Sequence, residues 1–158
     1  MDTYVRRSFF MTKKILLPTD GSKNAERAGE YAISLADISG ADIIVLNVID
    51  TNYLDALPQP DLRKSLNKEL RADGQKAVEK FQKKLEESQC NGVCKNIQFK
   101  TLIKEGKPSE AILKTIDEEG VDQVVMGKSG KHGLERAIIG RTTDRVVRDA
   151  NIPVNVIT

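Results

Sequence analysis

Short apolar runs alternate with amphipathic stretches along most of this chain. The run at residues 42–49 is almost continuously hydrophobic, which favours a strand buried on both faces, as in a parallel sheet. The run at residues 96–103 alternates polar and apolar positions, which is typical of a half-exposed edge strand. In all, the pattern predicts five strands, at residues 13–19, 42–49, 96–103, 121–126 and 152–157.

The stretches between these runs have helical periodicity. Ser22 is a predicted N-cap, Gly40 a predicted helix stop, and Gly74 a candidate interruption within a long helix. The segment 50–60 contains Pro58 and Pro60 and has no period, so we predict an exposed loop that could cover a ligand. Four helices are expected, at about residues 22–39, 61–89, 108–120 and 138–149.

Strands that alternate with helices predict a doubly wound α/β sheet with helices on both faces. Ligands of such sheets bind beyond the carboxyl ends of the strands. Asp20, the residues after Ile49 and the loop that begins at Gly127 all fall at that end. We therefore expect a binding site where these three segments meet.

Composition is that of one globular domain: the chain has 158 residues, of which 39% are apolar and 30% charged. We assign this domain to residues 13–158, because the first clear strand begins there. Residues 1–12 are treated as an N-terminal extension, either an upstream start or a flexible arm. Their apolar part is shorter than the about 7–15 residues of a secretory signal core.

The charge pattern argues against nucleic acid as a partner, because 25 basic and 23 acidic residues are interspersed and only 4% of residues are aromatic. No apolar run approaches the ~20 residues of a membrane span. We expect a soluble, cytoplasmic protein. Cys90 and Cys94 are spaced unlike a zinc site or a redox C-x₂-C motif, so we expect two reduced thiols.

Glycine is concentrated in one loop, at Gly127, Gly130 and Gly133, with Gly140 close behind. Glycine has no Cβ, so such a loop can turn its amides toward a bulky anion such as phosphate. The loop is not a Walker A sequence, because Asp122 stands where the first glycine should be. Nor is it a dinucleotide fingerprint, which should follow the first strand. A plain turn remains the alternative.

The spacing G-x₂-G-x₉-G (Gly127, Gly130, Gly140), followed by Thr142 and Thr143, is more specific. Together with PTDGS after the first strand and NVID at the end of the second, it resembles the universal stress protein family over essentially residues 13–158. Family members with this motif bind ATP. The resemblance implies a five-stranded parallel sheet in the order 3-2-1-4-5 and a homodimer paired through residues 152–157.

The resemblance also implies which residues hold the nucleotide. Asp20 would face the ribose, because a carboxylate next to a polyphosphate is repulsive unless it faces the ribose hydroxyls or holds a cation; a divalent cation (Mg²⁺ or Mn²⁺) is the alternative ligand. The start of the last helix would bind the phosphates through its amides and dipole. The predicted ATP site consists of Pro18, Thr19, Asp20, Val48, Met126, Gly127, Gly130, Gly140, Arg141, Thr142 and Thr143.

The chain departs from the family pattern after the last glycine, because Arg141 and Thr142 stand where ATP-binding members usually have serine and then a small apolar residue. The missing hydroxyl removes a donor, whereas a guanidinium folded back on the phosphates would add one. Three functions follow: a nucleotide-dependent regulatory switch, a slow ATPase or phosphotransferase, and a dimeric interaction module with an empty site. The first is our prediction, because no nucleophile and base pair is in view.

Overall fold

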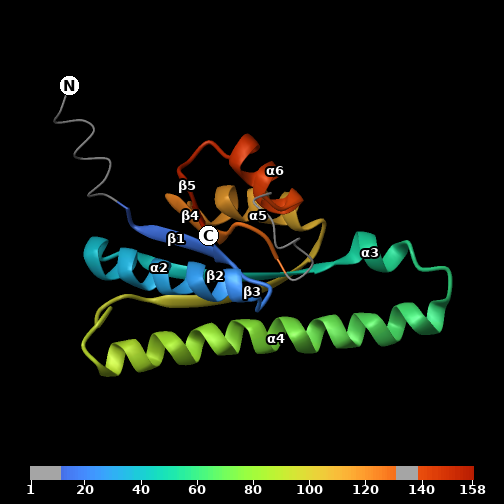
Figure 1. Cartoon of the computed structure of the whole chain (residues 1–158), viewed down its shortest axis with the longest axis horizontal. Helices are drawn as coiled ribbons and strands as arrows, with labels where there is room; N and C mark the ends of the chain where they lie inside the picture. Colours follow the sequence, from blue (N-terminus) through green and yellow to red (C-terminus); the bar gives the residue numbers. More distant parts are fainter. Residues whose placement is uncertain (1–11, 131–138) are drawn as a thin grey trace.

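A computed structural model of the chain describes residues 12–130 and 139–158. Its centre is a five-stranded parallel sheet in the order β3-β2-β1-β4-β5 (Figure 1), so the predicted fold and strand order are confirmed. The strands are β1 (Lys14–Pro18), β2 (Asp42–Asp50), β3 (Phe99–Gly106), β4 (Gln123–Gly127) and β5 (Val154–Ile157). The helices are α2 (Lys23–Ser39), α3 (Thr51–Asp55), α4 (Pro60–Cys90), α5 (Pro108–Glu119) and α6 (Arg141–Asp149).

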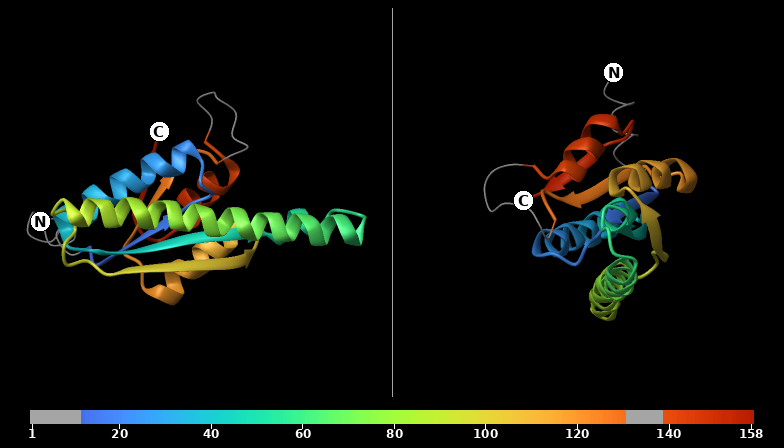
Figure 2. Two further views of the ribbon diagram at one scale, coloured as in Figure 1. Left: turned by 90° about the horizontal axis from the view of Figure 1, so that it is seen from below. Right: turned by 90° about the vertical axis from the view of Figure 1, so that its right-hand side faces the viewer.

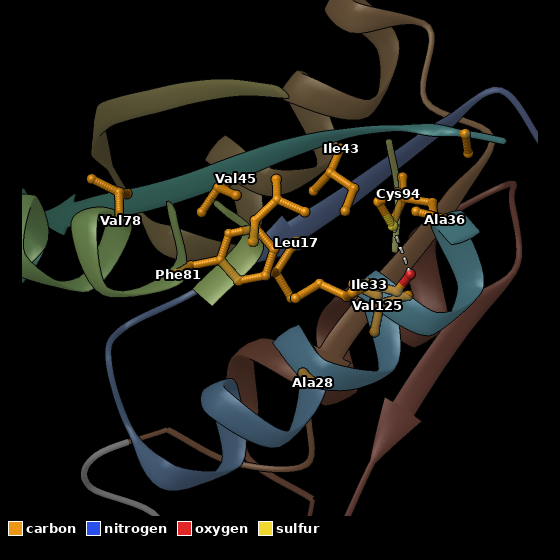
Figure 3. Close-up of a cluster of buried hydrophobic side chains, with 14 residues drawn as sticks. Leu17, Ala28, Ile33, Ala36, Ile43, Val45, Val78, Phe81, Cys94 and Val125 are labelled. Atoms are coloured by element: carbon orange, nitrogen blue, oxygen red, sulfur yellow. Dashed lines mark hydrogen bonds between the residues drawn. The ribbon is translucent and has the colours of Figure 1, made fainter. Parts of the chain in front are cut away.

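Helices cover both faces of the sheet, which explains why the middle positions of the central strands are mostly apolar (Figure 2). Alternate residues of a strand point to opposite faces. Ile15 and Leu17 of β1 therefore pack with α2 and α4, as Figure 3 shows for Leu17 and Phe81, while Leu16 packs with α5 and α6. The two hydrophobic cores share the strands and enclose them.

The prediction of a loop at residues 50–60 is wrong in part, because this segment contains the short helix α3. Its helical turn starts where Asp50 Oδ1 accepts a hydrogen bond from the amide of Tyr53 at 3.1 Å. The candidate break at Gly74 is also wrong, since α4 runs from Pro60 to Cys90 without interruption. Figure 1 shows α3 and the first part of α4 extending past the ends of the strands.

Other boundaries differ from the prediction by a few residues. Strand β3 begins at Phe99, not at residue 96, and β5 begins at Val154, not at residue 152. Helix α6 begins at Arg141, because Ile139 and Gly140 are not helical. Residue 138, the predicted helix start, lies outside the described residues, as do Lys131, His132, Gly133 and residues 1–11 of the predicted extension.

The caps of α2 agree with the sequence. Ser22 Oγ accepts a hydrogen bond from the amide of Ala25 at 3.2 Å, and Gly40 ends the helix with a φ of 74°. Thr12 is buried, and its hydroxyl accepts a hydrogen bond from Gln123 Nε2 at 2.6 Å, so this residue packs on the sheet. Within residues 12–130 and 139–158, every helix is too short or too polar to cross a bilayer.

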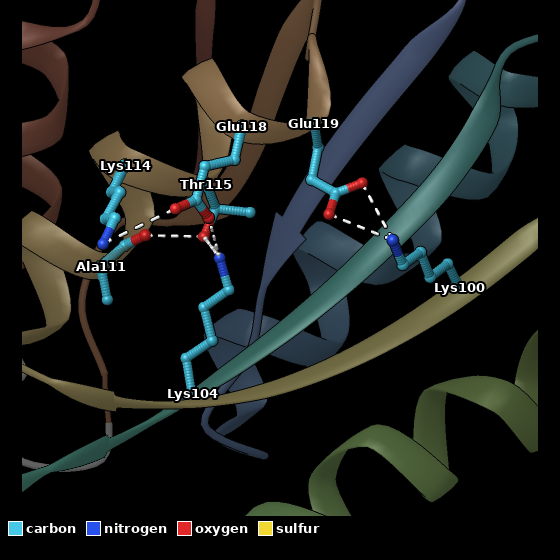
Figure 4. A network of polar contacts seen from close by, with 7 residues as sticks. All are labelled: Lys100, Lys104, Ala111, Lys114, Thr115, Glu118 and Glu119. Atoms are coloured by element: carbon cyan, nitrogen blue, oxygen red, sulfur yellow. Dashed lines mark hydrogen bonds and ion pairs between the residues drawn. The ribbon is translucent and has the colours of Figure 1, made fainter.

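Strand β3 is an edge strand, as predicted, and lysines on it hold α5 in place (Figure 4). Lys104 Nζ donates to Thr115 Oγ1 at 2.8 Å and to Glu118 Oε2 at 2.7 Å, while Lys100 Nζ lies 3.0 Å from Glu119 Oε2. The hydrogen bond from Lys104 holds the pKa of the Glu118 carboxyl below its ordinary value. These exposed pairs orient the helix more than they stabilise the fold.

The two cysteines are free and lie in different environments. Cys90 is exposed at the end of α4, whereas Cys94 is buried and its thiol donates to the carbonyl of Ile33 at 3.1 Å (Figure 3). Burial raises the pKa of the Cys94 thiol, and the carboxylate of Asp37 raises it further. Cys94 is therefore a core residue that stays protonated at neutral pH.

Substituting alanine for Gly74 tests the packing of α4 on β2. A Cβ at Gly74 would lie 2.2 Å from Asn47 Oδ1, which is held in a buried side chain. We expect Gly74→Ala to lower the free energy of unfolding in urea by about 1–3 kcal/mol. Lys76→Ala, at an exposed site on the same helix, is the control. A gain of about 1 kcal/mol, as usual for Gly→Ala within a helix, would contradict the contact.

Candidate functional site

The turn after β1 is held by backbone and side-chain hydrogen bonds. The amide of Thr19 donates to the carbonyl of Leu46 at 2.8 Å, and Asn47 Nδ2 donates to the carbonyl of Thr19 at 2.8 Å. Asp20 Oδ1 then accepts a hydrogen bond from the amide of Ser22 at 2.9 Å. Asp20 therefore helps to form the turn that starts α2.

Asp20 also reaches the glycine loop that follows β4. A Cβ at Gly130 would lie 2.3 Å from Asp20 Oδ2, so the carboxylate lies directly against the backbone of that glycine. The sequence alone placed these two residues at the same end of the sheet. The fold brings them into contact.

The glycines of the loop are needed for close packing within the protein. A Cβ at Gly127 would lie 2.9 Å from the carbonyl carbon of Asn24 in the first turn of α2, and a Cβ at Gly140 would lie 3.2 Å from Cα of Ser129. Neither glycine has a positive φ. The missing Cβ therefore makes room for neighbouring backbone, which differs from our expectation that it makes room for an anion.

The start of α6 faces the same region. Gly140 is its N-cap and no side chain caps it within the described residues, so the amides of residues 141–143 have no partner within the helix. The amide of Gly140 donates to the carbonyl of Lys128 at 2.9 Å, which fixes where the helix begins. Unpaired amides and the helix dipole favour an anion at this position.

Thr143 does not offer its hydroxyl to a ligand, because the hydroxyl donates to the carbonyl of Gly127 at 2.9 Å. The residue is 3% exposed, so it is a buried position of α6. Thr142 is half-buried beside it, and Arg141 is exposed. Thr143 therefore links α6 to the end of β4, and only its backbone is left for binding.

A cavity of about 700 Å³ lies between these segments, at the carboxyl ends of β1, β2 and β4. The eleven residues of the predicted ATP site all line this cavity. They are Pro18, Thr19, Asp20, Val48, Met126, Gly127, Gly130, Gly140, Arg141, Thr142 and Thr143. The structure thus brings the predicted set together from five separate segments.

Sequence reasoning missed a second group of lining residues. Asn47 and Ser129 directly neighbour predicted positions, and Asp50 is the first residue after Ile49, where the sequence placed one side of the site, so the strand-end rule could have found all three. Leu70, Asp73 and Gly74 come from α4, and no local signal marks them because the helix approaches the cavity only in the fold. The others are Ser22, Ala25, Leu46, Ile49, Pro108, Ile112 and Ile139.

The cavity has an apolar side and a polar side. Leu46, Ile112 and Met126 are buried beneath it and suit a flat aromatic base. The amides of α6 and the carboxylate of Asp20 form the polar part. Among the described residues, no group of three or more His, Cys, Asp or Glu side chains could hold a metal ion by itself. A cation here would need ligand oxygens from a nucleotide.

The sequence model of the universal stress protein family matches residues 11–158 of the chain. The chain belongs to this family. It is 31% identical over 157 residues to universal stress protein MJ0531 of Methanocaldococcus jannaschii, an alignment that covers 99% of this chain and 88% of that protein. The family assignment that the glycine spacing suggested is therefore confirmed.

Solved structures of universal stress proteins share the fold. Protein MJ0577, also from Methanocaldococcus jannaschii, superposes with a TM-score of 0.77 at 31% identity, covering 93% of this chain and 96% of that one. A universal stress protein from Archaeoglobus fulgidus, solved in complex with dAMP, gives a TM-score of 0.65 at 16% identity, covering 94% and 99%. At that identity the second comparison concerns the fold alone.

Replacing Thr143 tests the link between α6 and β4. Thr143→Val keeps the shape of the side chain but leaves the carbonyl of Gly127 without its donor. We expect the free energy of unfolding to fall by about 1–3 kcal/mol. Thr142→Val at the half-buried neighbour should change it by less than about 0.5 kcal/mol. Equal effects of the two substitutions in urea denaturation would show that the hydroxyl contact is unimportant.

Proposed function

We propose that the chain is an ATP-binding regulatory protein and that the cavity at the carboxyl ends of the strands is its nucleotide site. The observation that carries the proposal is the start of α6, which no side chain caps within residues 12–130 and 139–158, on one side of a cavity of about 700 Å³. Helix N-termini bind phosphate, and small-molecule sites are typically about 300–1,000 Å³. The volume and the unpaired amides together suit a nucleotide better than an inorganic anion.

The two ends of the cavity match the two ends of the nucleotide. Adenine would lie on the apolar side, beside Val48 and Met126, with the ribose near Asp20. The phosphates would lie at Gly130, Gly140 and the amides of residues 141–143. This orientation keeps the carboxylate of Asp20 on the ribose hydroxyls, or on a divalent cation bound to the phosphates.

Relatives support the proposal only in a general way. The protein from Archaeoglobus fulgidus was solved with an adenine nucleotide, but it shares only 16% identity with this chain. The proposal therefore depends on this chain's own residues, above all on G-x₂-G-x₉-G at Gly127, Gly130 and Gly140. Binding would alter the surface around the cavity, including α3, whose cap Asp50 lines it.

The location and assembly belong to the same proposal. A buried thiol at Cys94 and an exposed one at Cys90, both free, suit a reducing compartment such as the cytoplasm. Strand β5 is at the edge of the sheet. An edge strand with unpaired backbone groups favours pairing with another copy, so we propose a homodimer through residues 152–157.

Isothermal titration with ATP tests the nucleotide site. We expect Arg141→Glu to weaken ATP binding by about tenfold or more, because it places a carboxylate next to the phosphate end. The fold should tolerate the change, since acidic residues suit the first turn of a helix. Arg145→Glu, the same charge change one turn further on at an exposed site, is the control. Arg141→Ala reports whether the native side chain adds affinity.

Two results would contradict the proposal. One is the absence of binding to the wild-type chain at millimolar ATP. The other is an equal loss of affinity in Arg141→Glu and Arg145→Glu, which would mean that net charge, and not the start of α6, governs binding.

Light scattering after size exclusion tests the homodimer, with an expected mass of about 35 kDa, twice the 17.5 kDa of one chain. Pro153 and Ile157 direct their carbonyls at β4, so the amide of Val156 faces the open edge. Val156→Pro removes that donor and should give a monomer. Ile103→Pro on the opposite edge strand, β3, should leave a dimer. A monomeric wild type would refute the interface.

A further inference from the structure

Two side-chain amides hold the two loops that border the cavity. Asn47 Nδ2 donates to the carbonyl of Thr19 at 2.8 Å, in the turn after β1. Asn24 Nδ2 donates to Ser129 Oγ at 2.9 Å and to the carbonyl of Ser129 at 3.1 Å, in the loop after β4. Each loop carries residues that line the cavity, Thr19 in the first and Ser129 in the second.

Asn47 has little freedom to move. Its side chain is 6% exposed, and its Oδ1 lies against Gly74 of α4, where a Cβ would be only 2.2 Å away. Oδ1 has no hydrogen-bond partner among the described residues, so the bond from Nδ2 is the polar contact that orients the amide. Because β2 and α4 fix Asn47, the carbonyl of Thr19 is fixed as well.

Asn24 is fixed by its position in the first turn of α2. Its backbone occupies the space that a side chain at Gly127 would need, so α2 and the end of β4 cannot shift independently. The loop is held again where the amide of Gly140 donates to the carbonyl of Lys128 at 2.9 Å. Next to Lys128, the two bonds from Asn24 hold Ser129 in place.

We propose that Asn24 and Asn47 are positioning residues that act on different halves of the ligand, an inference that rests on the proposed ATP site. Asn47 holds the turn that contacts the nucleoside, and Asn24 holds the loop that contacts the phosphates. A loop that has lost its anchor must be ordered when the ligand binds, and the cost lowers the affinity. Only the part of the ligand that touches that loop is affected.

The test compares the affinities of full-length variants for ATP and for adenosine by isothermal titration. Asn24→Ala should weaken ATP binding by about five- to tenfold and change adenosine binding by less than about twofold. Asn47→Ala should weaken both ligands by the same factor, because both contain the nucleoside. For Asn24→Ala the ratio of the two affinities is the readout, since a general loss of stability would not change it selectively. For Asn47→Ala the readout is the loss of adenosine affinity, which neither Asn24→Ala nor the control variant should show.

Further variants keep the test decisive if one of the alanine variants unfolds. Ser129→Ala removes only one of the two acceptors of Asn24 and should weaken ATP binding by about two- to threefold, again without affecting adenosine. If Asn47→Ala does not fold, Asn47→Ser is compared with wild type in its place. Gln89→Ala is the control, because Gln89 also donates a side-chain amide to a loop carbonyl, that of Cys94, but does so away from the cavity.

The outcomes separate the two proposals. If wild-type protein binds neither ligand, the ATP site itself is refuted, and the positioning roles fall with it. Suppose that wild type binds ATP, but that Asn24→Ala and Ser129→Ala either weaken the binding of ATP and of adenosine equally or weaken the binding of neither. The assignment of Asn24 to the phosphate half is then overturned, while the ATP site stands.

Discussion

The site depends on the close approach of the first turn of α2 to the end of β4. There is no room for a side chain at Gly127, because the backbone of Asn24 fills that space. The contact places Asp20, at the beginning of the turn before α2, against Gly130 in the loop after β4. A larger residue at position 127 would separate the two segments and open the cavity on that side.

The rest of the fold keeps this contact in place. Strand β1 has a neighbouring strand on each side and helices on both faces, so its carboxyl end cannot move without disturbing both cores. Strand β4 is tied to α6 through Thr143 and to β5 through the bond from the amide of Lys128 to the carbonyl of Ile157. The loop after β4 is thus held by the strand proposed as the dimer interface, which joins the site to the edge of the sheet.

Much of the fold could be predicted from the sequence because the signals are local. A continuous apolar run such as residues 42–49 requires burial on two faces, and Gly40 stops a helix through its own backbone freedom. Signals of the same kind failed where tertiary contacts decide. Gly74 suggested a break, yet α4 continues because that position packs against Asn47 and helix propensity is a weak preference.

The sequence by itself determined that residues at the ends of the strands line the cavity, the eleven predicted ones among them, because the carboxyl ends of parallel strands must meet at one edge. It also determined the family, because the glycine spacing and the short segments PTDGS and NVID are specific sequence motifs. Only the tertiary structure decided that Leu70 and Asp73 of α4 border the same cavity, and that Asn24 and Asn47 anchor its loops. These contacts join segments far apart in the chain, and hydrogen bonds over such separations leave no periodic trace in the sequence.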